Sequence, residues 1–241
     1  LELDSQQKLV RVQPGVNFKS LQETLFTHGL FLPPFPASYM YSTIGGAIAN
    51  NSAGEQSFKY GMMSEWVDKL EVVLANGELI QTSRLSKKDV NKKKGLATLE
   101  GEIYRVVDGL LTEYEQQLDE YYDKLKVTKD SVGYDLRDVR RRDGSIDLTP
   151  LFVGSQGTLG IVTEAILKAA PHNPRTTLLV AAFDDLASAA DAVDKLRDLN
   201  PVALEMIDHN LIEFAEKEQS MVFPAELVEG DAKPAIVLFI E

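Results

Sequence analysis

Alternation of apolar and polar residues predicts β-strands in the first 170 residues of the chain. The alternating segments lie at residues 8–12, 68–75, 78–82 and 161–169. Asn76-Gly77 separates the two middle segments, and this dipeptide between apolar runs predicts a hairpin with a type I′ turn. Pro14-Gly15 follows the first segment and is expected to turn the chain there.

Helical spacing of apolar residues appears twice in the same region. Asn17 is expected to cap a helix that runs to about residue 28. A second helix is expected over residues 102–125, where apolar residues recur every three or four positions. Residues 86–98 are rich in lysine and residues 137–147 are rich in charge, so we expect both segments to be loops.

The pattern changes after Pro171 and Pro174, which bracket a domain boundary. A β-α-β-α-β series follows, with its first helix capped by Asp185, and its elements are expected at residues 177–183, 186–199, 202–207, 211–217 and 235–240. The fold class is therefore α+β, with two domains at residues 1–172 and 173–241. Because the chain lacks an initiator Met and both ends fall close to strands, we expect it to be a piece of a longer protein, with the second domain incomplete.

The composition is ordinary for a folded protein, since 44% of the 241 residues are apolar and 26% are charged. A formal net charge of −12 disfavours nucleic acid as a partner, because such a surface repels phosphate backbones. Without cysteine, the chain forms no disulfide, thiolate metal site or thiol nucleophile. No apolar run approaches the ~18 residues that span a bilayer. We expect a cytoplasmic protein and leave open peripheral membrane association of its full-length form.

Several common site motifs are absent. The chain contains neither G-x-x-x-x-G-K-[ST] nor G-x-S-x-G, and the glycines at 154, 157 and 160 lack the Rossmann spacing. No metal site is expected, because no acidic cluster has calcium-loop spacing and the three histidines are isolated at His28, His172 and His209. Residues 140–142 are all arginine, and this triplet either holds a phosphate or, as is more common, lies in a solvated loop.

Two segments could bind a ligand, although each could also be a tight structural loop. Residues 36–54 (PASYMYSTIGGAIANNSAG) contain adjacent glycines that allow a backbone to lie directly against a ligand. If residues 47–51 begin a helical turn, free amides at the Gly45-Gly46 corner form an anion site without a basic side chain. Residues 154–167 (GSQGTLGIVTEAIL) lead a glycine-rich turn into a strand whose first residues have exposed backbone.

The order of the motifs is more specific than any of them alone. Gly-Val after the first strand is followed by P-P-x-P-x-S, TIGGAIANNSAG, Lys59-Tyr60-Gly61, DKLEVVLANGEL, GYDL and GSQGTLGIVTEAIL. The series resembles the FAD-binding PCMH-type domain of the vanillyl-alcohol oxidase/p-cresol methylhydroxylase superfamily. Its closest likeness is to the branch of glycolate oxidase subunits and D-lactate and D-2-hydroxyglutarate dehydrogenases. The resemblance covers about residues 8–171, and residues 175–241 look like the start of that branch's ferredoxin-like α+β substrate domain.

The resemblance implies FAD as the cofactor, bound in extended form between two α+β subdomains, of which this chain would hold the second. The TIGG segment and the stretch after it would line the pyrophosphate and the flavin, with Thr43, Ile44, Gly45, Gly46, Asn50, Ser52 and Gly54. The segment just before it would add Pro36, Ala37 and Ser38. Backbone contacts to the adenosine half and the flavin edge would come from Gly157, Gly160, Ile161 and Val162.

The chain also departs from the family pattern. The family's first pyrophosphate loop should precede residue 8, and its His-rich metal and substrate motif should lie near the end of the C-terminal domain; neither is in this chain. Gln156 stands where many members carry Glu, and residues 86–131 are longer and more charged than the usual connection. No catalytic base is therefore assigned, and we expect the chain alone to bind FAD weakly and to be inactive.

In the intact enzyme, the resemblance implies oxidation of a small 2-hydroxy acid, such as D-lactate, glycolate or 2-hydroxyglutarate, by hydride transfer to FAD. A second electron acceptor, which the sequence does not identify, would reoxidise the flavin. Two alternatives stay open: a related FAD oxidase of sugars or aromatic alcohols, and a flavin-free scaffold that keeps only the fold.

Overall fold

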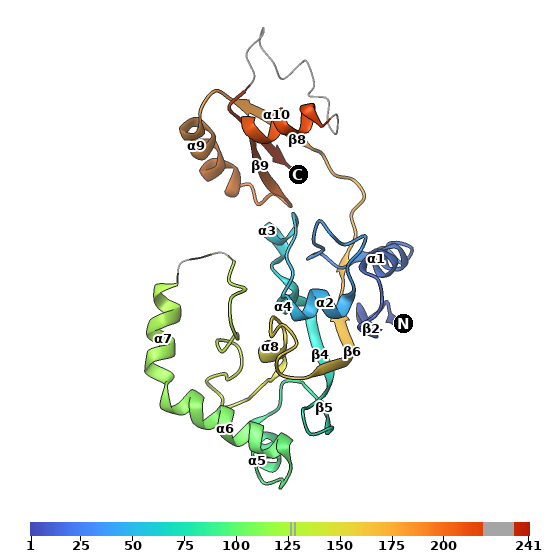
Figure 1. The fold of residues 1–241 in the computed structure, drawn as a ribbon, viewed down its shortest axis with the longest axis vertical. Coiled ribbons are helices and arrows are strands. Elements are labelled where there is room, and N and C mark those ends of the chain that lie inside the picture. Colours follow the sequence, from blue (N-terminus) through green and yellow to red (C-terminus); the bar gives the residue numbers. More distant parts are fainter. Residues whose placement is uncertain (126, 128, 219–233) are drawn as a thin grey trace. The chain divides into compact units, whose positions relative to one another are not determined.

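The computed structural model describes residues 1–125, 127, 129–218 and 234–241. The chain forms two compact units, whose elements are drawn in Figure 1. The first unit consists of Leu1–Gly54 and Gly61–His172, and the second of Glu55–Tyr60 and Asn173–Glu241. Of the helices in the described residues, none is both long and apolar enough to cross a bilayer.

A five-stranded antiparallel sheet organises the first unit. Its strands, in spatial order, are β1 (Glu2–Asp4), β2 (Leu9–Val12), β6 (Ile161–Lys168), β4 (Val67–Val73) and β5 (Leu79–Gln81). Strand β6 pairs with both β2 and β4, so the strand that comes last in the sequence of this sheet joins the first strands to the hairpin. Because side chains alternate across a strand, one face of the sheet is buried, with Val10, Val12, Leu70, Val72, Ala165 and Leu167 in the core.

Helix α1 (Phe18–Phe26) packs its apolar face into this core, with Leu21 and Leu25 fully buried. The predicted cap is confirmed, because the Asn17 side chain accepts a hydrogen bond from the Ser20 amide. The short elements of the unit are β3 (Leu30–Phe31), which pairs with β7 (Ala170–Pro171), and the helices α2 (Ile44–Ala49), α4 (Met63–Trp66) and α8 (Thr149–Phe152). Helix α3 (Ser57–Tyr60) belongs to the second unit.

The lysine-rich segment is a helix, so its prediction as a loop was wrong. Helix α5 spans Lys87–Lys94 and is capped by Ser86, whose hydroxyl accepts from the Asp89 amide. Val90 anchors it to the core, and the three lysines of its last turn lie where the helix dipole favours cations. Lysine itself is a good helix former, and the cap with its acidic third position outweighed the high polarity of the segment.

The helix predicted over residues 102–125 is instead two helices, α6 (Leu99–Glu113) and α7 (Glu115–Lys124). Helix α6 begins earlier than predicted because its first amides have acceptors: Thr98 Oγ1 accepts from Gly101, and the Glu78 carboxylate accepts from Leu99 and Glu100. These bonds hold the pKa of Glu78 below its ordinary value. Tyr114 separates the helices, with φ −106° and ψ 16°.

The hairpin between β4 and β5 exists as predicted, but its turn is not type I′. Only Gly77 has a positive φ, whereas type I′ requires one at Asn76 as well. The Leu74 carbonyl accepts from the Gly77 amide at 2.9 Å and the Leu74 amide donates to the Glu78 carbonyl at 2.8 Å, which closes a three-residue loop. The Asn76 side chain bonds both the amide and the carboxylate of Glu78 and stabilises this arrangement.

The second unit follows the predicted β-α-β-α-β order. Strands β8 (Leu179–Phe183), β10 (Ile236–Ile240) and β9 (Leu204–Asp208) form an antiparallel sheet in that spatial order, with helices α9 (Leu186–Arg197) and α10 (His209–Lys217). Asp185 caps α9, as predicted, by accepting from the Ser188 amide at 2.8 Å. The helix packs Ala189 against Leu238 and Ile240 of the central strand.

Candidate functional site

Helix α2 presents one buried and one exposed side, and the exposed side carries several of the predicted cofactor-binding residues. Ile44, Ala47 and Ile48 are buried in the core. Thr43, Gly46 and Asn50 are exposed, and their spacing of three and four places them on one side of the helix. Thr43 is the cap, since its hydroxyl accepts from the Gly46 amide at 3.2 Å.

The amides at the start of α2 are not free, so the predicted anion site at the Gly45-Gly46 corner is wrong. The helix begins at Ile44 rather than at residue 47, and the preceding segment crosses its N-terminus. The Ile44 amide donates to the Val16 carbonyl at 2.9 Å, and the Gly45 amide donates to the Pro14 carbonyl at 2.8 Å. With Gly46 bonded to Thr43, the first turn has no amide left for a phosphate.

Three of the predicted glycines are explained by packing within the protein. A Cβ on Gly54 would lie 1.8 Å from the Phe35 carbonyl oxygen, and one on Gly45 would lie 2.6 Å from Pro14 Cβ. A Cβ on Gly160 would lie 2.6 Å from Val72 Cγ1. A Cβ on Gly46, in contrast, would meet only Thr43 Oγ1, at an ordinary 3.4 Å. Packing inside the protein therefore does not require glycine at position 46.

The two glycine-rich segments lie against each other, although they are about a hundred residues apart in sequence. The Gly154 and Gln156 amides donate to the Ile48 and Ala49 carbonyls, both at 2.9 Å. The Gln156 side chain donates to Asn50 Oδ1 at 3.1 Å. These bonds cap the last turn of α2 from outside the helix, so both segments form one surface.

The turn at 154–158 has an unusual backbone that its hydrogen bonds hold in place. Gly154, Gln156 and Gly157 have φ values of +84°, +56° and +75°, and Gln156 is the one without glycine's freedom. Thr158 Oγ1 donates to the Ser155 carbonyl at 2.6 Å and lies 2.8 Å from the Tyr134 hydroxyl. A threonine hydroxyl carries one hydrogen, so Tyr134 must donate to Thr158.

Tyr134 is a residue that sequence reasoning missed as part of the site. The signal was present, because Tyr134 belongs to the GYDL motif, but nothing in the sequence places it beside Thr158. The segment around it is fixed to α7: the Leu136 amide donates to the Tyr122 hydroxyl at 3.1 Å, and the Arg137 guanidinium lies over the Tyr122 ring. Burial raises the pKa of Asp135, which lies between Tyr134 and Leu136 in the sequence, above its ordinary value.

The remaining predicted residues divide by exposure. Ile161 is 70% exposed at the start of β6, which is unusual for an isoleucine in a strand. Ala37 and Ser38 are also exposed, whereas Pro36 and Val162 are half-buried. Ser52 is buried, and its amide donates to Ala47 while its carbonyl accepts from Met63. The exposed side chains of Ser38 and Ile161 can therefore contact a ligand directly, whereas the buried side chain of Ser52 cannot.

The histidines do not form a site. His172 packs its ring against Phe26 and Phe31, with centroids 4.4 and 5.8 Å apart. The His28 ring lies 3.0 Å from the Thr24 carbonyl at the end of α1. Among the residues that the structure describes, no group of three or more His, Cys, Asp or Glu side chains could hold a metal ion.

Known proteins resemble this chain in sequence and in fold. Residues 1–83 match the family described as FAD binding domain. The glycolate oxidase subunit GlcD of Bacillus subtilis is 34% identical over 86% of this chain, and the D-lactate dehydrogenase of Archaeoglobus fulgidus is 29% identical over 90%. The D-2-hydroxyglutarate dehydrogenase of Pseudomonas putida is 27% identical over 90%. The chain spans 33%, 37% and 22% of these relatives.

A solved structure of alkyldihydroxyacetonephosphate synthase covers the whole chain with a TM-score of 0.62 at 19% identity, and the chain covers 35% of it. This likeness shows the fold and supports the α+β class predicted from the sequence. The family match supports FAD, the predicted cofactor of the domain. These comparisons agree with the resemblance to the flavoproteins of the vanillyl-alcohol oxidase/p-cresol methylhydroxylase superfamily, and residues 1–83 match an FAD-binding domain.

Proposed function

We propose that this chain is the FAD-binding part of an oxidoreductase that oxidises a 2-hydroxy acid. The names of its relatives support this substrate class, because glycolate, D-lactate and D-2-hydroxyglutarate are all 2-hydroxy acids. The observation that carries the cofactor site is the surface shared by Thr43, Gly46, Asn50, Gln156 and Gly157, called here the α2–turn surface. Its members are exposed, and hydrogen bonds join its two segments.

The α2–turn surface suits the uncharged parts of FAD. It contains no charged side chain, and the first amides of α2 already have acceptors. A pyrophosphate would need several charge-assisted hydrogen bonds, each worth about 1.5–3 kcal/mol. We therefore assign this surface to the flavin ring or the ribityl chain, where Gly46 allows close approach and Thr43 and Asn50 offer hydroxyl and amide groups. The pyrophosphate would bind elsewhere in the intact protein.

Bound FAD would supply the redox chemistry by accepting a hydride from the substrate carbon that bears the hydroxyl. The residues of the α2–turn surface would orient the cofactor and exclude water from one side of it. None of them titrates near neutral pH, so the base that accepts the hydroxyl proton must come from another part of the intact enzyme. We propose that residues 173–241 begin a substrate domain.

A flavin-free scaffold remains the second candidate, and one observation favours it. The satisfied amides of α2 mean that this loop can be stable without any ligand, so its retention does not by itself require FAD. The two candidates differ in a simple property, since only the first predicts a yellow protein.

The test is the visible absorption spectrum of the full-length protein, followed by anaerobic addition of D-lactate, glycolate or D-2-hydroxyglutarate. We expect flavin absorption that is bleached by at least one of these acids. A folded, colourless protein that takes up no added FAD would support the scaffold. If only a sugar or an aromatic alcohol bleaches the flavin, the proposed substrate class is wrong and FAD is still the cofactor.

A further inference from the structure

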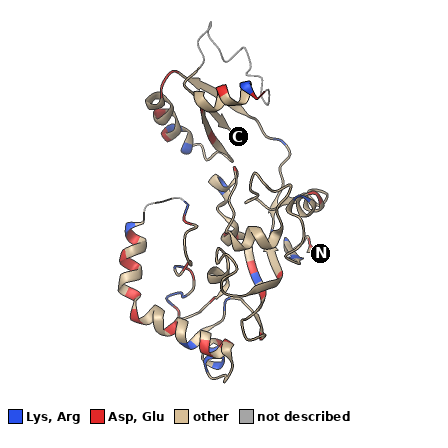
Figure 2. Ribbon diagram, viewed as in Figure 1, with Lys and Arg blue, Asp and Glu red and all other residues tan. Residues whose placement is uncertain are grey.

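Positive charge is concentrated in two segments of this acidic chain. Residues 84–95 and 137–145 hold ten of its 25 Lys and Arg residues but three of its 37 Asp and Glu residues. The two segments thus carry a formal charge of +7, and all other residues together carry −19. Figure 2 shows Lys and Arg on α5, which lies next to α6, and several Asp and Glu residues along α6 and α7.

The fold places the two segments side by side. Leu85 and Ile146 exchange backbone hydrogen bonds of 2.8 and 3.1 Å, and the Arg84 guanidinium donates to the carbonyls of Asp138 and Val139. The Lys87 side chain lies along the turn at Gly144, where an added Cβ would be 3.0 Å from Lys87 Cδ. The start of α5 and the turn at 141–144 therefore form one surface.

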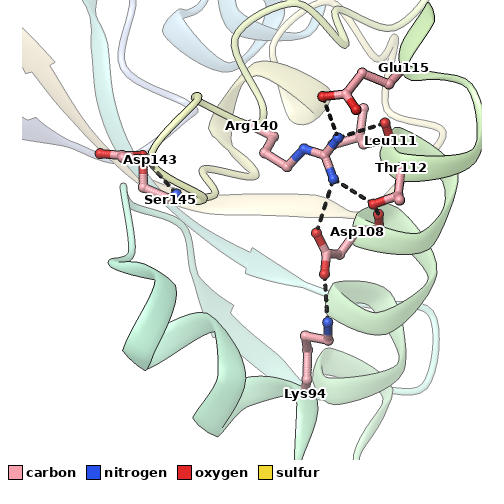
Figure 3. A network of polar contacts seen from close by, with 8 residues as sticks. All are labelled: Lys94, Asp108, Leu111, Thr112, Glu115, Arg140, Asp143 and Ser145. Atoms are coloured by element: carbon pink, nitrogen blue, oxygen red, sulfur yellow. Dashed lines mark hydrogen bonds and ion pairs between the residues drawn. The ribbon is translucent and has the colours of Figure 1, made fainter.

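Many of the cations in these segments are already paired. Arg140 bonds Asp108, Thr112, Glu115 and the Leu111 carbonyl, and Lys94 pairs with the same Asp108 (Figure 3). Lys92 and Lys93 pair with Asp89 and Glu100 at 2.8 and 2.6 Å. The pair of Lys92 lies within α5. The pairs of Lys93, Lys94 and Arg140 fix α5 and the 137–145 segment to α6 and to the start of α7, which is a structural role.

Five cations of the two segments are exposed and form no ion pair with any residue that the structure describes. Arg137 lies over the Tyr122 ring, and the other four are Lys87, Lys88, Arg141 and Arg142. The carboxylates near them are held by other bonds: Asp143 accepts from the Ser145 amide at 2.9 Å, and Asp89 binds Lys92 and Ser86. We call these four residues the basic patch.

We propose that the basic patch is a docking surface for a short acidic segment of another protein. Its small size favours this partner over an extended polyanion. Asp89 and Asp143 are adjacent in sequence to its members, and the carboxylates paired with Lys93, Lys94 and Arg140 belong to the same region. A membrane or a long nucleic acid would therefore also meet negative charge. In addition, α5 exposes no large apolar side chain that could enter a bilayer, because Val90 is buried.

The test measures binding of a fluorescent ten-residue glutamate peptide to the full-length protein by anisotropy, at 50 and 200 mM salt. The variant is Lys88→Glu with Arg142→Glu. The control is Lys8→Glu with Lys195→Glu, two other exposed lysines, because it changes the net charge equally. We expect binding that weakens with salt, falls at least about fivefold in the variant and changes less than about twofold in the control. Both pairs should keep their melting temperatures, since all four side chains are exposed.

Equal losses in variant and control would overturn the proposal, because binding would then depend on net charge alone. Absence of peptide binding at 50 mM salt would overturn it as well. Phosphatidylserine vesicles and a 20-base-pair DNA serve as competitors. If either binds more tightly than the peptide at the same salt, and loses affinity in the variant, the partner is an extended polyanion and not an acidic protein segment.

Discussion

The glycine-rich segments and the charged segment of the first unit are held by different interactions. At the α2–turn surface, backbone groups make the contacts, since Gly154 and Gln156 donate to carbonyls of α2. Around residues 137–145, charged side chains make many of the contacts. Arg140, for example, pairs with both Asp108 and Glu115 (Figure 3). Backbone pairing leaves a surface without charge that a large uncharged ligand can approach closely. Beside these ion pairs, the cations of the basic patch have no ion-pair partner among the described residues, and they can attract a negatively charged partner.

The largest effect should come from the close backbone packing in the glycine-rich region. Replacing Gly54 by Ala puts a Cβ 1.8 Å from the Phe35 carbonyl oxygen, which a backbone cannot easily avoid. We expect a loss of at least about 3 kcal/mol in the free energy of unfolding, measured by urea denaturation. Gly15→Ala is the matched control, because nothing lies within 4 Å of its added Cβ. A small effect at Gly54 would show that the 35–36 segment moves freely, and our description of this packing would be wrong.

The charged region should be weakened most by Arg140→Met. This change removes the bonds to Asp108, Thr112 and Glu115 and leaves the Leu111 carbonyl without its donor. We expect a loss of about 1–3 kcal/mol in thermal or urea unfolding. Arg141→Met should change the free energy of unfolding by less than about 0.5 kcal/mol, because that side chain is exposed. Similar losses for both arginines would remove the distinction between the paired cation and the basic patch.

A smaller effect should separate backbone strain from side-chain bonding in the turn. Gln156 has φ +56° and bonds Asn50. Gln156→Ala loses the bond and keeps the strain, whereas Gln156→Gly loses the bond and relieves the strain. We expect the glycine variant to be more stable than the alanine variant by about 1 kcal/mol in urea denaturation. An alanine variant at least as stable as the glycine variant would mean that this φ carries no cost.

The smallest effect should be a dependence on pH at Asp135. Burial raises the pKa of its carboxyl, so the folded state favours the protonated form. The carboxyl therefore contributes stability at low pH that is lost as the pH rises through its raised pKa. Asp135→Asn keeps an oxygen for the Arg137 amide and should raise the melting temperature slightly at pH 7. This gain should vanish below about pH 3.5, where aspartate is protonated in both states. If the variant is less stable than the parent protein at pH 7, the ionised Asp135 carboxylate does not destabilise the folded state, and the direction of its pKa shift is wrong.

Local signals were enough to predict the elements whose stability is local. The caps Asn17 and Asp185 have short polar side chains directly before apolar periodic runs, and both accept the amide hydrogen bonds expected of them. The hairpin at residues 67–81 was likewise found from its alternation and from Asn76-Gly77, although Glu78 altered the turn through its bonds to Asn76.

The errors came from contacts between distant residues. The amides of α2 were wrongly expected to be free. Their acceptors, the carbonyls of Pro14 and Val16, lie some thirty residues earlier, where no local pattern indicates them. The helix at Lys87–Lys94 was missed because Val90 is its one buried residue, so apolar periodicity had nothing to detect. Tyr134 was quoted as part of a motif, but its hydrogen bond to Thr158 depends on how the chain folds around α7.

If the exposed side of α2 lies against FAD, a bulky residue in place of Gly46 should remove the cofactor. Gly46→Val should be tolerated by the fold, because the added Cβ would meet only Thr43 Oγ1 at 3.4 Å, and yet it should block a ligand that lies on the helix. Gly109→Val is the control, since Gly109 is an exposed helical glycine with nothing within 4 Å of an added Cβ. In the full-length protein we measure the FAD content by absorbance and the FAD affinity by titration of the apoprotein. We expect loss of FAD in the first variant and full FAD content in the second, with both variants folded. Retention of stoichiometric FAD after Gly46→Val would contradict this expectation.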